Sequence, residues 1–366
     1  MKSKKIVIVC NSKNPDMSQY FKCKIEALKQ SDLKDTFIVF KNRYIDMDGE
    51  NIYNSSYTKS AFFDKKIPLD FLKSFYIFFI LLSNKAKVIH FTTAHISNIF
   101  LSMLLKPFRV KQIFTIHDLV PHPGKKAIFI KMYNNFVINF LSDEIISFSN
   151  SEILKQKKKN KFTYMTLSGF TQFIKEPKIG NKTILFFGRI ESYKGLNNLL
   201  DLVKKANEVK LDYKFIIAGK GNIDNISAFQ KYNNVEVINR FIDDNEVQVL
   251  FNKATFTILP YDSATQSGVT ILSYSYATPV IAYDVGSLKE YTEDNYNGFM
   301  VIHKDNDEII KKLKNIADEN IKKLSSNIIQ EFDEKYSTKA CMKKYFDYYT
   351  KQIVNLSQKT ILFYLL

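Results

Sequence analysis

Two cations follow the most clearly defined strand in the second half of the sequence. An apolar run at Thr183–Phe187 predicts a buried strand, Gly188 provides a turn, and Arg189 and Lys194 follow that turn. Apolar residues then recur at helical spacing and predict a helix that begins near Ser192. Because cations oppose the dipole at a helix N-terminus, two of them there indicate a bound anion with more than one charge. Two solvated surface cations would give the same pattern.

A second helix start follows a later apolar strand. Ser267 is a good N-cap residue, and Gly268 lets a ligand approach the backbone N–H groups closely. The predicted helix runs to Thr278-Pro279. One of its faces carries Val269, Leu272, Ser273 and Tyr276. A phosphate or a sugar hydroxyl could bind at such a helix start, although a capped helix often has a purely structural role.

Histidines follow a strand candidate in the first half. The apolar run Gln112–Ile116 ends just before His117 and Asp118, and His122 lies in a loop marked by prolines. The end of this strand would place His117 at the cleft expected between two domains, but a lone histidine can also be a satisfied core residue. Metal ligation is the weakest alternative, because no Cys or Glu within sequence reach completes a tetrahedral set. The sequence predicts no metal site.

These side chains can meet only if the fold brings the ends of several strands to one edge of a sheet. Short apolar runs alternate with helical patterns, which is typical of parallel sheets flanked by helices. Strands are predicted in the first half at Lys5–Cys10, Thr36–Phe40, Lys87–Phe91, Gln112–Ile116 and Glu144–Phe148. Strands are predicted in the second half at Thr183–Phe187, Lys214–Ala218, Val235–Ile238, Phe256–Leu259 and Pro279–Ala282. The fold class is therefore α/β, with helices such as Ser18–Gln30 between the strands.

The length of 366 residues favours two domains of this kind. The polar segment Ser168–Lys182 contains Gly169, Pro177 and Gly180, so we expect the linker there. Ligands of doubly wound sheets bind at the carboxyl ends of the strands. We therefore expect the active site in a cleft between the two domains.

Composition excludes several classes of protein. Hydrophobic residues make up 45% and charged residues 25%, which is ordinary for a globular chain. Three cysteines without paired spacing argue against a disulfide framework and indicate a reducing compartment. The longest apolar run, Phe75–Leu82, is far shorter than the ~20 residues of a membrane-spanning helix.

The net charge of +16 is unevenly distributed. Residues 1–170 carry 27 basic and 13 acidic side chains, whereas the remainder is almost balanced. This asymmetry indicates that the first half faces an anionic partner, either a bilayer surface or nucleic acid. A codon bias toward Lys would raise the charge everywhere, not in one half. The sequence has no recognised nucleic-acid-binding motif, so we expect no nucleic-acid partner.

The order of these motifs resembles glycosyltransferase family 4. The resemblance covers about residues 183–302. It is carried by Gly188-Arg189, Lys194-Gly195, Gly219-Lys-Gly221, Gln266-Ser267-Gly268-Val269 and Ala277-Thr-Pro279. It implies the GT-B arrangement of two Rossmann-like domains, with residues 1–170 binding the acceptor and residues 171–338 binding a nucleotide sugar. Residues 339–366 would form a helix that returns to the N-terminal domain.

The resemblance also implies roles for individual residues. Arg189 and Lys194 would bind the donor diphosphate and stabilise the leaving group, which makes them catalytic together with His117. The predicted donor-binding residues are Gly188, Gly219, Gly221, Thr265, Gln266, Ser267, Gly268, Val269 and Ser273. Asp118 and His122 would contact the acceptor. Transfer would proceed with retention, without a metal and without a cofactor other than the donor substrate.

Two glutamates usual in the family are absent. When the segment from Gly268 to Pro279 is aligned with the family pattern, Thr265 and Ser273 stand where the family has these glutamates. The second glutamate normally holds the nucleotide ribose, and the first faces the donor sugar. The hydroxyls of Thr265 and Ser273 could still bind donor hydroxyls.

Two segments indicate contact with an anionic membrane. Leu69–Leu82 is rich in aromatic residues, and Glu152–Lys161 contains five lysines. A buried helix and a solvated basic face would explain the same residues. The helix predicted at Lys339–Asn355 is followed by an apolar tail that could touch either protein or lipid.

The sequence therefore predicts a cytoplasmic enzyme, peripheral on the inner face of the plasma membrane. It would transfer a sugar from a UDP- or GDP-sugar to a growing, lipid-linked surface glycan such as a capsule, O-antigen or exopolysaccharide. The alternative is a glycosyltransferase-like subunit that has lost catalysis and supports an active partner.

Overall fold

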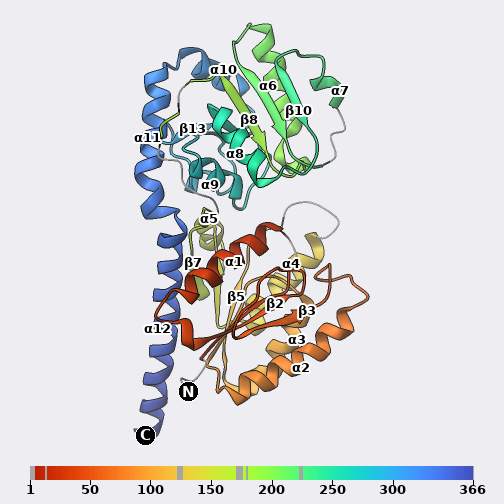
Figure 1. Cartoon of the computed structure of the whole chain (residues 1–366), viewed down its shortest axis with the longest axis vertical. Helices are drawn as coiled ribbons and strands as arrows, with labels where there is room; N and C mark the ends of the chain where they lie inside the picture. The colour runs from red at the N-terminus through yellow and green to blue at the C-terminus, as the bar shows by residue number, and fades with distance from the viewer. Residues whose placement is uncertain are drawn as a thin grey trace. The chain divides into compact units, whose positions relative to one another are not determined.

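A computed structural model describes residues 5–12, 15–121, 127–169, 176–178, 180–221 and 226–365. The chain divides into two compact units, which Figure 1 shows in full. Unit 1 comprises Met1–Ser168 and Thr338–Leu366, and unit 2 comprises Gly169–Ser337. The division falls within the segment predicted as the linker, of which residues 170–175 and 179 lie outside the described part.

Seven parallel strands in the order β3-β2-β1-β4-β5-β6-β7 form the sheet of unit 1. The strands are β1 (Ile6–Cys10), β2 (Phe37–Asn42), β3 (Ile52–Ser56), β4 (Val88–Phe91), β5 (Lys111–Thr115), β6 (Glu144–Ser147) and β7 (Phe162–Tyr164). The helices are α1 (Pro15–Lys29), α2 (Ile67–Ser83), α3 (Ile96–Leu105), α4 (Ala127–Phe136), α5 (Asn150–Leu154) and α12 (Thr338–Leu365). Single turns are η1 (Lys34–Thr36), η2 (Lys106–Phe108), η3 (Val137–Leu141) and η4 (Lys159–Lys161).

The two faces of this sheet carry different side chains, because successive residues of a strand point to opposite sides. Val7 and Val9 of β1 pack in an apolar core that includes Ile77 of α2 and Leu101 of α3. On the opposite face, His90 of β4 reaches the C-terminal helix α12, where its Nδ1 lies 2.5 Å from the hydroxyl oxygen of Tyr349. One face therefore packs through apolar side chains, and the other buries polar groups such as His90 beside apolar residues such as Ile8.

Six parallel strands in the order β10-β9-β8-β11-β12-β13 form the sheet of unit 2. They are β8 (Thr183–Phe187), β9 (Lys214–Ala218), β10 (Val235–Ile238), β11 (Phe256–Leu259), β12 (Val280–Tyr283) and β13 (Gly298–Val301). The helices are α6 (Leu196–Glu208), α7 (Ile226–Phe229), α8 (Asp244–Lys253), α9 (Gly268–Ser275), α10 (Asn306–Asn315) and α11 (Asp318–Lys335). Single turns are η5 (Ser192–Lys194) and η6 (Leu288–Glu290).

The predicted strands all exist, and four of them in unit 2 have the predicted bounds. Three strands were not predicted from the sequence: β3, β7 and β13. All three lie at an edge of their sheet, where one side of the strand has no partner and a long apolar run is not required. In addition, β12 begins after Pro279, which has no N–H to donate to a neighbouring strand.

No helix among the described residues is both long and apolar enough to cross a bilayer. The longest, α12, extends ten residues beyond the predicted end at Asn355.

A buried lysine joins α1 to α12. Lys24 is 1% exposed, and its Nζ lies 3.6 Å from the ring centroid of Tyr345. Burial holds the pKa of Lys24 well below its usual value. Its amino group makes cation–π contacts but no hydrogen bond to a described residue. Burying an amino group that is protonated and hydrated in the unfolded chain costs free energy whether the group stays charged or loses its proton, so we expect Lys24 to lower the stability of unit 1.

Replacing Lys24 with methionine is therefore expected to stabilise unit 1. Met fills a similar volume without the desolvation penalty, and a gain of about 1 kcal/mol would raise the thermal midpoint by about 2–4 °C. Lys178 in unit 2 is the matched control: it is also buried, but its Nζ donates to the carbonyl of Phe251 at 2.7 Å, near the end of α8. Calorimetry should show a higher midpoint for Lys24→Met and a lower one for Lys178→Met. A lower midpoint for both variants would contradict this interpretation of Lys24.

Candidate functional site

Two glycines let the carboxyl ends of β8 and β9 approach each other. Gly188 has φ +105° and Gly219 has φ +150°, conformations that residues with a side chain rarely adopt. The Gly188 N–H donates to the Ala218 carbonyl at 3.0 Å. A Cβ atom built on Gly219 would lie 1.9 Å from the carbonyl oxygen of Gly188, so no larger residue fits there. These predicted donor-binding residues therefore have a structural role of their own.

Gly221 extends the same close contact. The Ile190 N–H donates to the Lys220 carbonyl at 3.0 Å, and a Cβ on Gly221 would lie 2.1 Å from the Ile190 carbonyl oxygen. Asn239 completes the turn, because its Oδ1 accepts from the Gly221 N–H at 3.1 Å. The loops after β8 and β9 are thus joined through their backbones.

Lys194 lies at the centre of this edge of the sheet. It is buried, and its Nζ lies 5.6 Å from the ring centroid of Tyr261, which follows β11. A Cβ built on Gly188 would be 3.0 Å from that Nζ and 3.4 Å from Cγ2 of Val269 in α9. The structure therefore brings the predicted donor residues Gly188, Lys194 and Val269 together.

The predicted helix start near Ser192 is wrong. Residues 192–194 form the single turn η5, and α6 begins at Leu196. Gly195 between them has φ +70°, and a Cβ there would lie 1.7 Å from the Pro260 carbonyl oxygen. The close packing of these two loops interrupts the helix, so Lys194 precedes α6 and does not lie in its first turn.

Arg189 has a different environment from Lys194. Its side chain is exposed and forms an ion pair with Glu191 at 3.1 Å. Exposed pairs of this kind contribute little to stability, so the guanidinium can change partner at small cost.

The loop from β11 to α9 carries the remaining predicted donor residues. Ser267 caps α9 by accepting a hydrogen bond from the Thr270 N–H at 3.2 Å, as predicted. A Cβ on Gly268 would meet no atom within 4 Å, so protein packing does not require glycine there. The Gln266 Oε1 atom is buried without a hydrogen-bond partner among the described residues. Thr265 is buried, and its carbonyl accepts from Ser287 Oγ at 2.7 Å.

Ser273 does not fit its predicted role at a donor. It is fully buried, and its Oγ lies 2.7 Å from Thr257 Oγ1 in β11 and 2.8 Å from the Thr278 carbonyl oxygen. Its hydroxyl is therefore satisfied inside the core of unit 2. The helix also ends at Ser275, before the predicted Thr278, and is buried on more than the one predicted face.

Sequence reasoning missed a polar cluster beside this site. The Asp262 Oδ1 atom lies 3.1 Å from both Asn198 Nδ2 and His303 Nε2, and 3.4 Å from Lys304 Nζ. Burial alone would raise the pKa of Asp262, but these hydrogen bonds and Lys304 lower it. The cluster fixes Asp262 near Tyr193, whose carbonyl accepts from the Asp262 N–H at 2.8 Å. Its members are far apart along the chain, so no local motif could have revealed it.

In unit 1, His117 follows the carboxyl end of β5. Its Nε2 lies 3.0 Å from the Thr92 carbonyl oxygen, which can only accept, so Nε2 carries the proton. Burial lowers the pKa of His117 and favours the neutral ring. The other nitrogen, Nδ1, then keeps a lone pair. His117 also lines a small cavity with Lys24, Thr93 and Thr115.

Only one of the two predicted acceptor residues lies in the described part of the chain. Asp118 is half-buried, and its carbonyl accepts a hydrogen bond from Asn134 Nδ2 at 2.8 Å. His122 lies outside the described residues.

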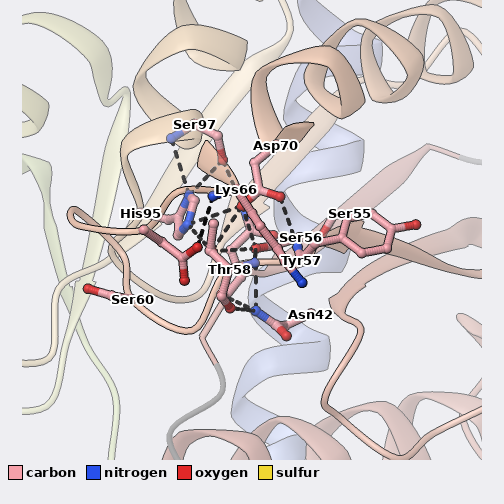
Figure 2. A network of polar contacts seen from close by, with 12 residues as sticks. Asn42, Ser55, Ser56, Tyr57, Thr58, Ser60, Lys66, Asp70, His95 and Ser97 are labelled. Atoms are coloured by element: carbon pink, nitrogen blue, oxygen red, sulfur yellow. Dashed lines mark hydrogen bonds and ion pairs between the residues drawn. The ribbon is translucent and has the colours of Figure 1, made fainter. Parts of the chain in front are cut away.

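A buried polar network fills the carboxyl edge of the unit 1 sheet near β3 (Figure 2). Asp70 of α2 accepts from Ser56 Oγ at 2.7 Å, from the Tyr57 N–H at 2.8 Å and from Thr58 Oγ1 at 2.9 Å. Because the Thr58 proton goes to Asp70, His95 Nε2 donates to Thr58 Oγ1 at 2.8 Å. No sequence pattern indicated this network, because its members are separated along the chain.

The network continues to the turn after β1. Asn11 Nδ2 donates to Asn98 Oδ1 at 2.8 Å, and Ser55 Oγ donates to Asn11 Oδ1 at 2.5 Å. Asn42 Nδ2 donates to the Asn11 carbonyl at 2.9 Å. Side-chain hydrogen bonds therefore join the ends of three neighbouring strands. No group of three or more His, Cys, Asp or Glu in the described part of the chain is placed to hold a metal ion.

Comparison with known proteins identifies what this architecture is similar to. Residues 181–319 match the family described as Glycosyl transferases group 1. An uncharacterized glycosyltransferase of Methanocaldococcus jannaschii is 28% identical over 163 residues, 43% of this chain and 45% of the relative. An uncharacterized 41.2 kDa protein in the cps region of Klebsiella pneumoniae is 26% identical over 62% of this chain and 68% of its own length. The first of these alignments thus spans less than half of the relative.

Solved structures identify the fold. Anabaena HepE in complex with UDP-glucose matches 95% of this chain and 99% of its own with a TM-score of 0.69 and 14% sequence identity. Identity this low shows the fold alone. The two parallel sheets and the whole-chain match give this protein the GT-B fold.

Two glycine substitutions should have opposite effects on folding. Gly219→Ala should prevent correct folding of unit 2, because its Cβ would collide with the Gly188 carbonyl. Gly268→Ala should fold with unchanged or slightly higher stability, because its Cβ has space. Circular dichroism and thermal unfolding check both. A stable Gly219→Ala variant would contradict the described approach of the two loops.

Unit 1 should lose stability in mild acid. Burial lowers the pKa of His95 to about 4, although Asp70 opposes this, and burial also lowers the pKa of His90 and His117. Between pH 6.5 and about 4 the unfolded chain binds more protons, so stability falls as pH falls through that range. We expect a loss on the order of 1–3 kcal/mol, measured by urea unfolding followed by circular dichroism.

His95→Asn is the control for this pH dependence. Asn keeps the capacity to cap α3 but does not titrate, so the variant should have a smaller pH dependence than the parent. A parent protein that is equally stable at neutral pH and in mild acid would contradict the assignment.

Proposed function

We propose that this protein is a retaining, metal-independent hexosyltransferase of family 4. The GT-B fold and the match of residues 181–319 to Glycosyl transferases group 1 support this proposal. The protein would transfer a sugar from a UDP- or GDP-sugar to a growing glycan. One observation carries the proposal: the buried Lys194 amino group lies beside Gly188 and the start of α9. Unit 2 would bind the donor, and unit 1 the acceptor.

The geometry around Lys194 suits a diphosphate. The first N–H groups of α9 have no partner within the helix and carry partial positive charge, and Ser267 accepts from the one at Thr270. Lys194 adds a cation beside them, and the exposed Arg189 can exchange Glu191 for a phosphate oxygen. As the bond to the sugar breaks, negative charge grows on the departing nucleotide. Fixed positive groups that stabilise this charge lower the barrier.

Two other residues would complete the donor site in unit 2. Gln266 has a buried amide oxygen that could accept from a sugar hydroxyl. Gly268 leaves space over the start of α9. In unit 1, neutral His117 could accept the proton of a substrate hydroxyl at Nδ1. No cofactor other than the donor substrate is needed for this scheme.

For the acceptor, we propose a lipid-linked cell-surface glycan at the cytoplasmic face of the plasma membrane. The Klebsiella pneumoniae relative supports a glycan of the capsule type, since its name places it in the cps region. The excess of basic residues in the first half supports an anionic surface as partner. Nucleic acid is not part of the proposal.

A second candidate function is a binding subunit without turnover. It is favoured by the missing glutamates: Thr265 and Ser273 stand at their expected positions, and the Ser273 hydroxyl is hydrogen-bonded inside the core, so Ser273 does not replace a carboxylate at a donor. Such a subunit would bind a nucleotide or glycan and support an active partner.

Calorimetric titration of the purified chain with UDP and GDP tests the donor site. One nucleotide should bind, and Lys194→Ala should weaken it by roughly 10- to 100-fold, the value of a charge-assisted hydrogen bond to phosphate. Arg189→Ala should have a smaller effect, because that side chain is more hydrated. Lys205→Ala is the control: Lys205 pairs with Asp307 at 2.8 Å on another part of unit 2 and should leave affinity unchanged.

Release of nucleotide from a panel of UDP- and GDP-sugars, with lipid-linked glycans as acceptors, separates the two candidate functions. Nucleotide binding with turnover supports the enzyme, whereas binding without turnover supports the subunit. Equal affinity in the parent and Lys194→Ala would contradict both, because both depend on the same anion site.

A further inference from the structure

The outward face of α2 is apolar along its whole length. Its exposed side chains recur at helical spacing and are Leu69, Leu72, Phe75, Tyr76 and Phe79. Leu72 is 65% exposed and Phe79 64%. The inward face of the same helix instead includes Asp70 and Ser74, which are buried. Ile77 and Leu81 are also buried on the inward face, so α2 carries apolar side chains on both of its faces. A helix whose outer face meets only water is expected to have polar residues there.

The apolar surface continues onto α3 and η2. The ring of Phe100 in α3 contacts Phe71 and Phe75 of α2, with centroids 5.3 and 5.2 Å apart. The ring of Phe108 in η2 contacts Phe78 at 5.2 Å. Met103 and Phe108 are themselves about half exposed. In Figure 1, α2 and α3 lie side by side in unit 1.

The helix α4 and the turn η3 extend this apolar surface. Four exposed apolar residues of α4 and η3 recur every four positions: Ile128, Met132, Phe136 and Phe140. Phe129 of α4 contacts Phe63, which precedes α2, with ring centroids 4.8 Å apart. We refer to the exposed apolar residues of α2, α3, η2, α4 and η3 as the aromatic face.

Unit 2 has no comparable surface among its described residues. Its large exposed hydrophobic side chains are Val209, Phe241, Val249 and Ile302, on separate elements. Scattered residues of that kind are normal on any protein, whereas a contiguous apolar surface marks an interaction site.

Basic residues lie on the same elements as the aromatic face or directly beside them. They are Lys65, Lys66, Lys73, Lys106, Arg109 and Lys131. Lys73 lies over the ring of Tyr76 at 5.0 Å. Asp64 and Asp70 are the acidic residues of the 64–83 segment, and Asp70 is buried. The surroundings are therefore cationic, and they complement a negatively charged partner.

We propose that the aromatic face docks on an anionic lipid bilayer. Aromatic side chains with basic neighbours suit the bilayer interface, where the rings enter the headgroup region and the cations meet lipid phosphates. The helices would lie on the membrane and not span it. This inference rests on the proposed function and deepens it, because docking would hold unit 1 next to an acceptor in the same bilayer.

The absence of tryptophan from the sequence allows a clean test. Phe79→Trp introduces a single indole fluorophore on the aromatic face, and Phe241→Trp introduces one at a 70% exposed site of unit 2. With phosphatidylglycerol-containing vesicles, the indole emission of the Phe79→Trp variant should shift to the blue and be quenched by brominated acyl chains. The Phe241→Trp control should show neither change. Phosphatidylcholine vesicles should bind more weakly than anionic ones.

Variants that place negative charge on the aromatic face test directly whether this face docks on the bilayer. Leu72→Glu with Phe79→Glu should reduce vesicle sedimentation at least tenfold, and Val249→Glu in unit 2 should not. All three sites are exposed, so unchanged circular dichroism is expected. UDP and GDP titration without vesicles should be the same in all variants, which separates failure of docking from failure of the proposed function.

Two results would overturn the proposal. One is vesicle binding that is absent, or equal in the parent and the double variant. The other is a dimer in analytical ultracentrifugation that Leu72→Glu with Phe79→Glu dissociates, which would assign the face to a second copy of the chain.

Discussion

The close approach of the loops after β8 and β9 is the constraint on which the candidate site depends. Gly188 and Gly219 both have backbone conformations that favour glycine, and the Gly188 carbonyl occupies the space of a Gly219 side chain. Gly195 repeats this contact against Pro260. Three strand ends are thereby held together without side chains between them. Lys194 is buried in that junction, beside Gly188 and Val269.

Much of unit 2 was predictable from the sequence, because its strands are short apolar runs between turn residues. The bounds of β8, β9, β10 and β11 and the capping role of Ser267 agree with the structure. The direction of Ser273 was not predictable, since one residue of register turns a helical side chain by about 100°. The Asp70–His95 network was also beyond sequence reasoning, because it forms between residues on separate elements.

The two units differ in their surfaces as well as in their sites. Unit 1 carries most of the excess positive charge and the aromatic face, and its sheet edge is filled by neutral or paired polar groups. Unit 2 is nearly balanced in charge, and the polar groups of its candidate site lie at one strand edge around Lys194. This division is consistent with the proposal that unit 2 binds the donor and unit 1 meets a membrane-bound acceptor.

A crystal structure of the chain with its preferred nucleotide diphosphate would test the central claim most directly. The diphosphate should lie within hydrogen-bond distance of Lys194 Nζ and of the first N–H groups of α9, with Gly268 against the phosphate. A nucleotide bound elsewhere, with Lys194 still over the Tyr261 ring and without a phosphate contact, would contradict the assignment of this edge of unit 2 as the donor site.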